Sequence, residues 1–140
     1  MPGAPVEVLK RVPLFADLNK REVAQVARLF KERRFADGET VAKEGAGGAA
    51  FFLIDSGEAS VTLGGTPRAT LKPGDYFGEV ALIDGGARSA TVTASSELVC
   101  WGLTYWDFRP LVQGNASICW KLLQSMAKRM REAEQRPSES

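Results

Sequence analysis

The sequence predicts a mainly β domain, a sandwich or barrel, with helices at both ends. Glycines recur through residues 35–104 and separate short apolar and β-branched runs, a pattern typical of short strands joined by tight turns. On either side, in residues 5–34 and 105–136, the apolar spacing is helical instead. The length of 140 residues fits one domain, which can bury a core without a disulfide or a metal ion.

Residues 5–34 are expected to form short helices. Asp17 or Asn19 can cap the second of them. The charged run at residues 31–34 is interpreted as the solvated end of that helix. The apolar residues of these helices are Val6, Leu9, Val12 and Leu14 in the first and Val23, Val26, Ala27 and Phe30 in the second.

The glycine-punctuated segment is expected to contain six short strands, because each apolar run is only a few residues long. A hairpin loop at residues 64–68 would join two of them. The expected strands are 40–42, 50–54, 59–63, 69–71, 90–94 and 98–103.

Residues 105–136 are expected to form two helices, broken at Gly114, with Asn115 as the N-cap of the second. The first half of the last helix should pack on its own barrel. Toward Met130 it should outrun the barrel, where a partner, such as a second copy in a homodimer, explains the apolar stripe better. Residues 137–140 are expected to be a frayed tail. The stripe comprises Cys119, Leu123, Met126, Met130 and Ala133, widened by Ile118 and Leu122, with coiled-coil-like spacings of 4 and 3.

Composition excludes several classes of function. Eighteen Lys and Arg against seventeen Asp and Glu give a net charge of +1, which argues against nonspecific nucleic-acid binding. The absence of histidine excludes Ser-His-Asp and Cys-His catalysis and His-ligated zinc or haem iron. Cys100 and Cys119 lie outside any Cys-x-x-Cys pattern and are expected to be reduced, packed thiols. We therefore expect no metal ion, no cofactor and none of the catalysis that depends on histidine.

The chain is expected to be soluble and cytoplasmic, with no membrane partner. Residues 1–12 hold charges and prolines and lack the apolar core of a signal peptide. No window approaches the roughly 20 apolar residues of a membrane span.

Residues 76–91 differ from the rest of the chain because they combine groups suited to a nucleotide. Residues 80–83 can make one helical turn, whose N–H groups would face an anion, after Gly78 allows a close backbone approach. Arg88 and Ser89 offer a guanidinium and a hydroxyl for a phosphate. Glu79 can accept hydrogen bonds from a sugar hydroxyl. Taken alone, these residues also fit a structural ion pair between Glu79 and Arg88 beside a tight turn.

The same segment resembles the phosphate-binding cassette of the cyclic nucleotide-binding domain family. This family includes bacterial catabolite activator proteins, regulatory subunits of cyclic-AMP-dependent protein kinase and cyclic-nucleotide-gated channels. The matching motifs are Phe77-Gly78-Glu79, Ala81-Leu82 and Arg88-Ser89-Ala90-Thr91, with further similarity at residues 12–15, 37–39, 44–45, 52–58 and 73–75.

The resemblance implies one domain over residues 5–136: a β-roll (a double-stranded β-helix, jelly-roll-like) with N-terminal helices and two C-terminal helices. It implies that Arg88 pairs with the cyclic phosphate and that Glu79 binds the ribose 2′-hydroxyl. The other implied contacts are Gly78, Ala81 and Ser89 as hydrogen-bond donors, and Phe77, Val61 and Val80 as apolar walls. The expected ligand is cyclic AMP, with cyclic GMP as the second choice.

Three departures from the family pattern affect these expectations. Ala87 stands where many members have proline before the cassette arginine, which loosens the turn but removes no ligand. The hairpin at residues 64–68 is short. Ala133 and Glu134 occupy the positions at which catabolite activators present hydroxyls to adenine, which puts that route of base recognition in doubt.

The favoured function is a non-enzymatic cyclic-nucleotide sensor that signals through its C-terminal helices. Its target would be an unknown effector protein or a missing output domain, because no DNA-reading helix follows the last helix before Ser140. The chain would then be a standalone sensor or a regulatory domain of a longer protein, and it would not bind nucleic acid by itself. One alternative is a degenerate member that serves as a dimerisation scaffold. A cupin-like enzyme is a remote third, because it requires metal ligands.

Overall fold

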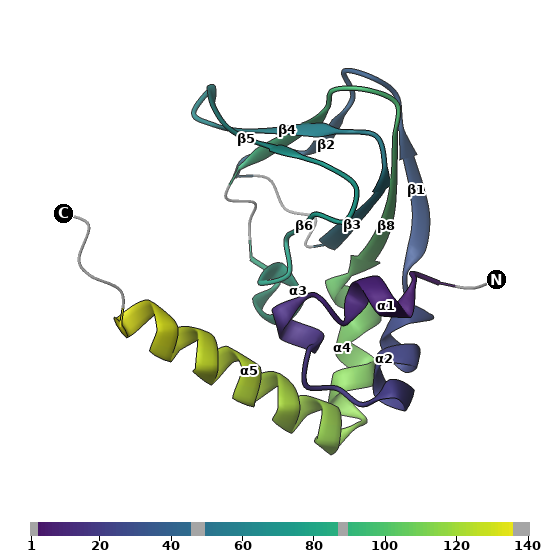
Figure 1. Ribbon diagram of the computed structural model, residues 1–140, viewed down its shortest axis with the longest axis vertical. Coiled ribbons are helices and arrows are strands. Elements are labelled where there is room, and N and C mark those ends of the chain that lie inside the picture. The colour runs from purple at the N-terminus through teal and green to yellow at the C-terminus, as the bar shows by residue number, and fades with distance from the viewer. Residues whose placement is uncertain (1–2, 46–49, 87–89, 136–140) are drawn as a thin grey trace.

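The computed structural model describes residues 3–45, 50–86 and 90–135, and it confirms the mainly β fold with flanking helices. Figure 1 shows the strands gathered at one end and most of the helices at the other. The described strands form two antiparallel sheets of four strands each. One sheet has the order β1 (Lys31–Phe35), β8 (Leu98–Thr104), β3 (Ala50–Ser56), β6 (Tyr76–Phe77), and the other β2 (Thr40–Ala42), β7 (Thr91–Ala94), β4 (Ala59–Leu63), β5 (Thr66–Leu71).

Strand β3 is buried on both faces and links two apolar cores. Phe51 and Leu53 belong to the core that the helices cover, whereas Phe52 and Ile54 point into the core between the sheets. This follows from the alternation of side chains along a strand. The β3 run is therefore continuously apolar. The helices are α1 (Val6–Leu9), the 3-10 turn η1 (Pro13–Phe15), α2 (Lys20–Ala27), α3 (Ala81–Asp84), α4 (Tyr105–Gln113) and α5 (Ala116–Gln135).

All six strands expected from the glycine pattern are present, with one clear shift in a boundary. Strand β5 begins at Thr66, so the loop predicted at residues 64–68 is a turn of Gly64 and Gly65. Both glycines have positive φ, 58° and 80°, as a two-residue hairpin turn of type I′ requires. These two glycines are enough to reverse the chain, so the residues on either side of them pair as parts of the two strands.

The prediction that residues 31–34 end a helix is wrong. They form strand β1, which pairs with β8 from Lys31 opposite Gly102 to Phe35 opposite Leu98. β1 lies at the edge of its sheet, where charged side chains reach solvent and discourage pairing with other chains. The preceding helix α2 ends earlier, at Ala27. Its predicted cap is confirmed at Asn19, which forms a capping box with Glu22.

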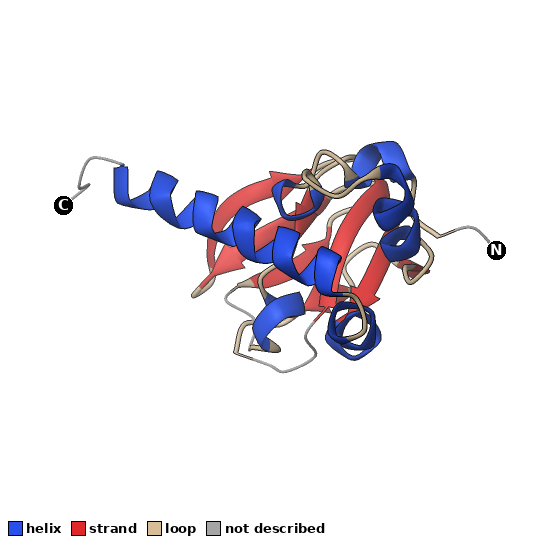
Figure 2. Ribbon diagram, turned by 90° about the horizontal axis from the view of Figure 1, so that it is seen from below, coloured by secondary structure: helices blue, strands red, loops and turns tan. Residues whose placement is uncertain are grey.

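Helix α5 is anchored as far as Lys128 and then extends beyond the rest of the molecule (Figures 1 and 2). Asn115 caps it, as predicted, by accepting the backbone N–H of Ile118 at 3.0 Å. The Ser125 hydroxyl donates to the Pro13 carbonyl at 2.9 Å. Lys121 pairs with the buried Glu22 at 2.8 Å, and Lys128 lies 3.5 Å from Asp17. These contacts fasten α5 to the N-terminal helices.

The side of α5 that packs on the domain agrees with the predicted stripe only in part, at Ile118, Leu122 and the partly buried Met126. Its buried residues are Ile118, Leu122 and Ser125, whereas Leu123 and Met130 are 56% and 65% exposed. The polar Ser125 disguises the buried face in the sequence, because a hydroxyl there packs by donating to a backbone carbonyl. No helix among the described residues has the length and apolar character needed to cross a bilayer.

Candidate functional site

A pocket of about 440 Å³ lies where strands of both sheets meet the short helix α3. This volume is in the range of small-molecule sites. The first sheet contributes β6, and the second contributes β2, β4 and β7. The lining residues are Ala42, Val61, Phe77, Gly78, Glu79, Val80, Ala81, Asp84, Gly86, Ala90 and Val92.

The chain turns sharply between β6 and α3, and this turn forms one wall of the pocket. The Phe77 ring stacks on Phe52 at a centroid distance of 5.3 Å, which fixes the end of β6. Gly78 follows with φ of 87°, a conformation that residues with a Cβ rarely adopt. The N–H groups of Ala81 and Leu82 donate to the carbonyls of Gly78 and Glu79, so the single turn predicted at residues 80–83 is observed one residue later.

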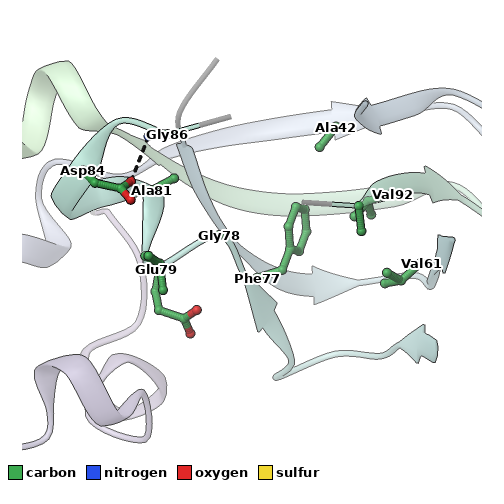
Figure 3. A pocket seen from close by; sticks show the side chains of 11 residues that line it. Ala42, Val61, Phe77, Gly78, Glu79, Ala81, Asp84, Gly86 and Val92 are labelled. Carbon is green, nitrogen blue, oxygen red and sulfur yellow. Dashed lines mark hydrogen bonds between the residues drawn. The ribbon is translucent and has the colours of Figure 1, made fainter. Parts of the chain in front are cut away.

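The pocket has a polar end and an apolar end (Figure 3). The Glu79 and Asp84 carboxylates lie at one end, and the side chains of Ala42, Val61 and Val92 lie at the other. Asp84 is held in place because its carboxylate accepts the Gly86 N–H at 2.8 Å. A molecule that is polar at one end and apolar at the other fits this arrangement.

Glu79 is half-buried, and it makes no hydrogen bond or ion pair with the residues that the structure describes. Its carboxylate is thus able to accept hydrogen bonds from a ligand. The backbone N–H groups of Glu79 and Val80 likewise donate to no acceptor in the described ranges. The predicted structural ion pair of Glu79 with Arg88 is not tested, because Arg88 lies outside the described residues.

Six of the eight predicted site residues line this one pocket: Val61, Phe77, Gly78, Glu79, Val80 and Ala81. The other two, Arg88 and Ser89, lie outside the described residues. The residues on either side of the 87–89 segment, Gly86 and Ala90, both line the pocket. The described lining contains two carboxylates and no cationic side chain.

Sequence reasoning missed Arg129, a residue of α5 whose charge acts on Tyr76 of β6. Burial raises the pKa of Tyr76, the neighbouring Glu79 charge adds to the rise, and the Arg129 charge opposes it. The charges of Glu79 and Arg129 therefore act on the same hydroxyl. The Arg129 Nη1 atom is buried and has no hydrogen-bond partner in the described part of the chain. The signal in the sequence was its spacing from Ile118, Leu122 and Ser125, which continues the buried face of α5.

No group of three or more Cys, Asp and Glu residues in the described ranges is arranged to hold a metal ion. Cys100 is fully buried in the core between the sheets. Burial raises the pKa of its thiol to about 11, and the charge of Asp55 adds to this effect. It is therefore a packing residue at neutral pH.

Comparisons with known proteins agree with this geometry. Residues 32–115 match the family described as "Cyclic nucleotide-binding domain". A cAMP-dependent protein kinase regulatory subunit of Yarrowia lipolytica is 47% identical over 92 residues, which are 64% of this chain and 24% of the relative. The chain thus spans about a quarter of that relative's length.

Two bacterial proteins are similar over more of their length. The Cyclic AMP receptor protein of Thermus thermophilus is 33% identical over 131 residues, 90% of this chain and 61% of that protein. The crystal structure of the N-terminal domain of a transcriptional regulator from Streptomyces coelicolor superposes with a TM-score of 0.85 at 28% identity, over 95% of this chain and 99% of that one. This chain belongs to the cyclic nucleotide-binding domain family, and its sheets form that family's β-roll.

Proposed function

We propose that this domain is a sensor that binds cyclic AMP in the pocket between β6, α3 and the second sheet. The observation that carries the proposal is the pocket itself, in which the Glu79 carboxylate, which has no partner in the described part of the chain, lies opposite an apolar end formed by Ala42, Val61 and Val92. Glu79 would accept a hydrogen bond from the ribose hydroxyl, and the apolar end would hold the base. The Thermus and Yarrowia relatives, whose names refer to cAMP, support this choice of nucleotide.

Arg88 would supply the cation that the cyclic phosphate needs. Support comes from the placement of Gly86 and Ala90, the residues that flank the 87–89 segment, in the wall of the pocket. Ser89, Gly78 and Ala81 would add hydroxyl and backbone donors. Phe77 and Val80 would complete the walls.

Arg129 offers a route by which ligand binding would reach α5. Its charge and that of Glu79 act on the same tyrosine, Tyr76, although no ion pair joins the two charges in the described part of the chain. A ligand that hydrogen-bonds to Glu79 changes the field in which Arg129 sits. Helix α5 would then shift relative to the β-roll, and its free C-terminal end would pass the change to an effector protein or to a further domain.

Isothermal titration calorimetry of the purified protein tests the proposal, with cyclic AMP, cyclic GMP and 5′-AMP as parallel ligands. We expect one site per chain for cyclic AMP and a much weaker interaction with 5′-AMP, because opening the ring adds a charge and alters the phosphate geometry. Tighter binding of cyclic GMP than of cyclic AMP would support the sensor function but identify cyclic GMP as the ligand. If no heat of binding is detected and the nucleotides do not compete with a fluorescent cyclic nucleotide, the sensor proposal is wrong. The scaffold alternative, a degenerate member that dimerises without ligand, would then remain.

A further inference from the structure

Positive charge is concentrated at the helical end of the molecule. Residues 1–30, which precede strand β1, hold five Lys and Arg and three Asp and Glu, whereas residues 31–104, which form the β-roll, hold seven Lys and Arg and ten Asp and Glu. The near-neutral total thus conceals a basic end and an acidic β-roll. In Figure 1 the basic end includes α2, on the opposite side of the molecule from the free end of α5.

The outward side of α2 borders a shallow hollow that is surrounded by cationic side chains. It is lined by Lys20, Arg21, Ala24, Gln25 and Arg28. These positions share one side of the helix, because residues three or four apart lie next to each other. Lys20, Arg21 and Arg28 are exposed, and the small Ala24 lies between them. We call these three cations the basic face.

The carboxylates of the same segment do not neutralise the basic face. Glu22 pairs with Lys121, and Asp17 lies 3.5 Å from Lys128, so both face α5. Glu32 pairs with Arg34 at 3.0 Å. Lys20, Arg21 and Arg28 have no ion pair with any residue in the described ranges. Glu22 and Asp17 are thus occupied in holding α5, which leaves the outward side of α2 with a concentrated positive charge.

We propose that the basic face is a docking surface for an acidic segment of a partner protein. From Lys20 to Arg28 the face spans only about 12 Å along the helix axis, which suits a few carboxylates of a peptide. A nucleic-acid duplex needs a longer cationic track than these three side chains provide. The hollow at Ala24 would take a side chain, and the guanidinium groups of Arg21 and Arg28 would bind carboxylates in a forked geometry.

Fluorescence anisotropy with a labelled Glu/Ser peptide, long enough to span the face, tests this proposal. A Gln/Ser peptide of the same length is the neutral probe. The test variant is Lys20→Glu/Arg21→Glu/Arg28→Glu, with the corresponding triple Gln variant as a milder change. The matched control is Lys43→Glu/Arg68→Glu/Lys72→Glu, which changes net charge equally at three exposed cations of the β-roll. Circular dichroism verifies the fold of each variant.

We expect the parent to bind the acidic peptide and not the neutral one, with affinity that falls as salt is added. The α2 triple Glu variant should bind at least about tenfold more weakly, and the control less than about threefold. Cyclic-nucleotide titrations should be unchanged in both, so the outcome is independent of the proposed sensor function. Equal loss in the two triples, or no peptide binding by the parent, would overturn the proposal. So would tighter binding of an oligonucleotide or of phosphatidylglycerol vesicles, or self-association of the parent that the α2 triple abolishes.

Discussion

Arg88 is the residue on which the proposed phosphate contact depends, because the described pocket lining holds two carboxylates and no cation. Replacing Arg88 with Ala should weaken cyclic AMP binding by about 2–5 kcal/mol, since the phosphate charge is then buried without a partner. This corresponds to roughly 30- to several-thousand-fold in Kd. Removing the Glu79 carboxylate should cost less, about 1.5–3 kcal/mol for a charge-assisted hydrogen bond.

Calorimetry of Arg88→Ala, Glu79→Ala and Arg68→Ala with cyclic AMP measures which variant loses the most binding free energy. Arg68 is an exposed arginine of β5 away from the pocket lining and serves as the control. Unchanged affinity in Arg88→Ala would exclude the phosphate assignment, and it would favour the reading in which this arginine has only a structural role.

Glu22 is the residue that should give folding stability its dependence on acid pH. Hydrogen bonds from the Lys121 side chain and the Asn19 backbone lower the pKa of Glu22 from 4.5 to about 2. Because the folded-state pKa lies below the unfolded one, the unfolded chain binds the proton first as pH falls. Its contribution to stability is therefore full above about pH 5 and is lost as pH falls toward 2.

Urea denaturation at pH 7 and pH 3 checks this contribution. Glu22→Ala should lower the free energy of unfolding at pH 7 by about 2–3 kcal/mol, because Lys121 loses its partner and the capping box is broken. The loss should shrink at pH 3. Glu32→Ala, which breaks the exposed pair with Arg34, should cost less than about 1 kcal/mol at either pH. A pH-independent loss in Glu22→Ala would contradict the role assigned to its ionisation.

At the scale of elements, the exposed side of α5 has the features of a homodimer seam, which remains a prediction. Leu123 and Met130 are seven residues apart and exposed, and they lie beside the buried face rather than on it. We expect the parent to sediment as a dimer and Leu123→Glu/Met130→Glu as a monomer. The control Gln124→Glu/Arg131→Gln changes charge equally on another side of the same helix. A monomeric parent, or a dimer in both variants, would refute the seam.

The elements differ in how much of them the sequence predicts, for identifiable physical reasons. Glycines with positive φ lie in the turns beside β2, β3, β4 and β5, so these short strands are well delimited in the sequence, whereas β7 and β8 are joined by Ser95, Ser96 and Glu97 without a glycine. Strand β1 has four charged residues in a row, and only its pairing with β8 makes it a strand. Strand β6 has two residues, too few for any periodicity.

The pocket was predictable where the chain is continuous and not where distant elements meet. The residues from Phe77 to Ala81 are consecutive and carry a recognisable motif. Ala42 and Val92 are small apolar residues that only the β2–β7 pairing brings to the pocket. Arg129 comes from α5, and its place follows from the packing of Leu122 and Ser125 against the domain. Tertiary contacts of this kind leave little trace in local sequence.

At the scale of the molecule, the two cores share strand β3, so the domain should unfold as one unit. The pocket opens beside the core between the sheets, which includes Ala42 and Val92. The tryptophans lie on the helical side, at Trp101 of β8, Trp106 of α4 and Trp120 of α5. A ligand in the pocket should therefore stabilise the tryptophan environment as much as the sheets, although it touches only one of the two cores.

Thermal unfolding followed by tryptophan fluorescence and by far-ultraviolet circular dichroism measures this coupling. Cyclic AMP at 100 times its Kd should add about 2.7 kcal/mol to the free energy of unfolding. For a domain of this size, that corresponds to an increase in Tm of about 10 °C. Both probes should report the same increase, and Arg88→Ala should gain less than about 1 kcal/mol at the same ligand concentration. A shift seen by circular dichroism alone would mean that the two cores unfold separately, so a signal from the pocket would not reach α5 through the packing of β3.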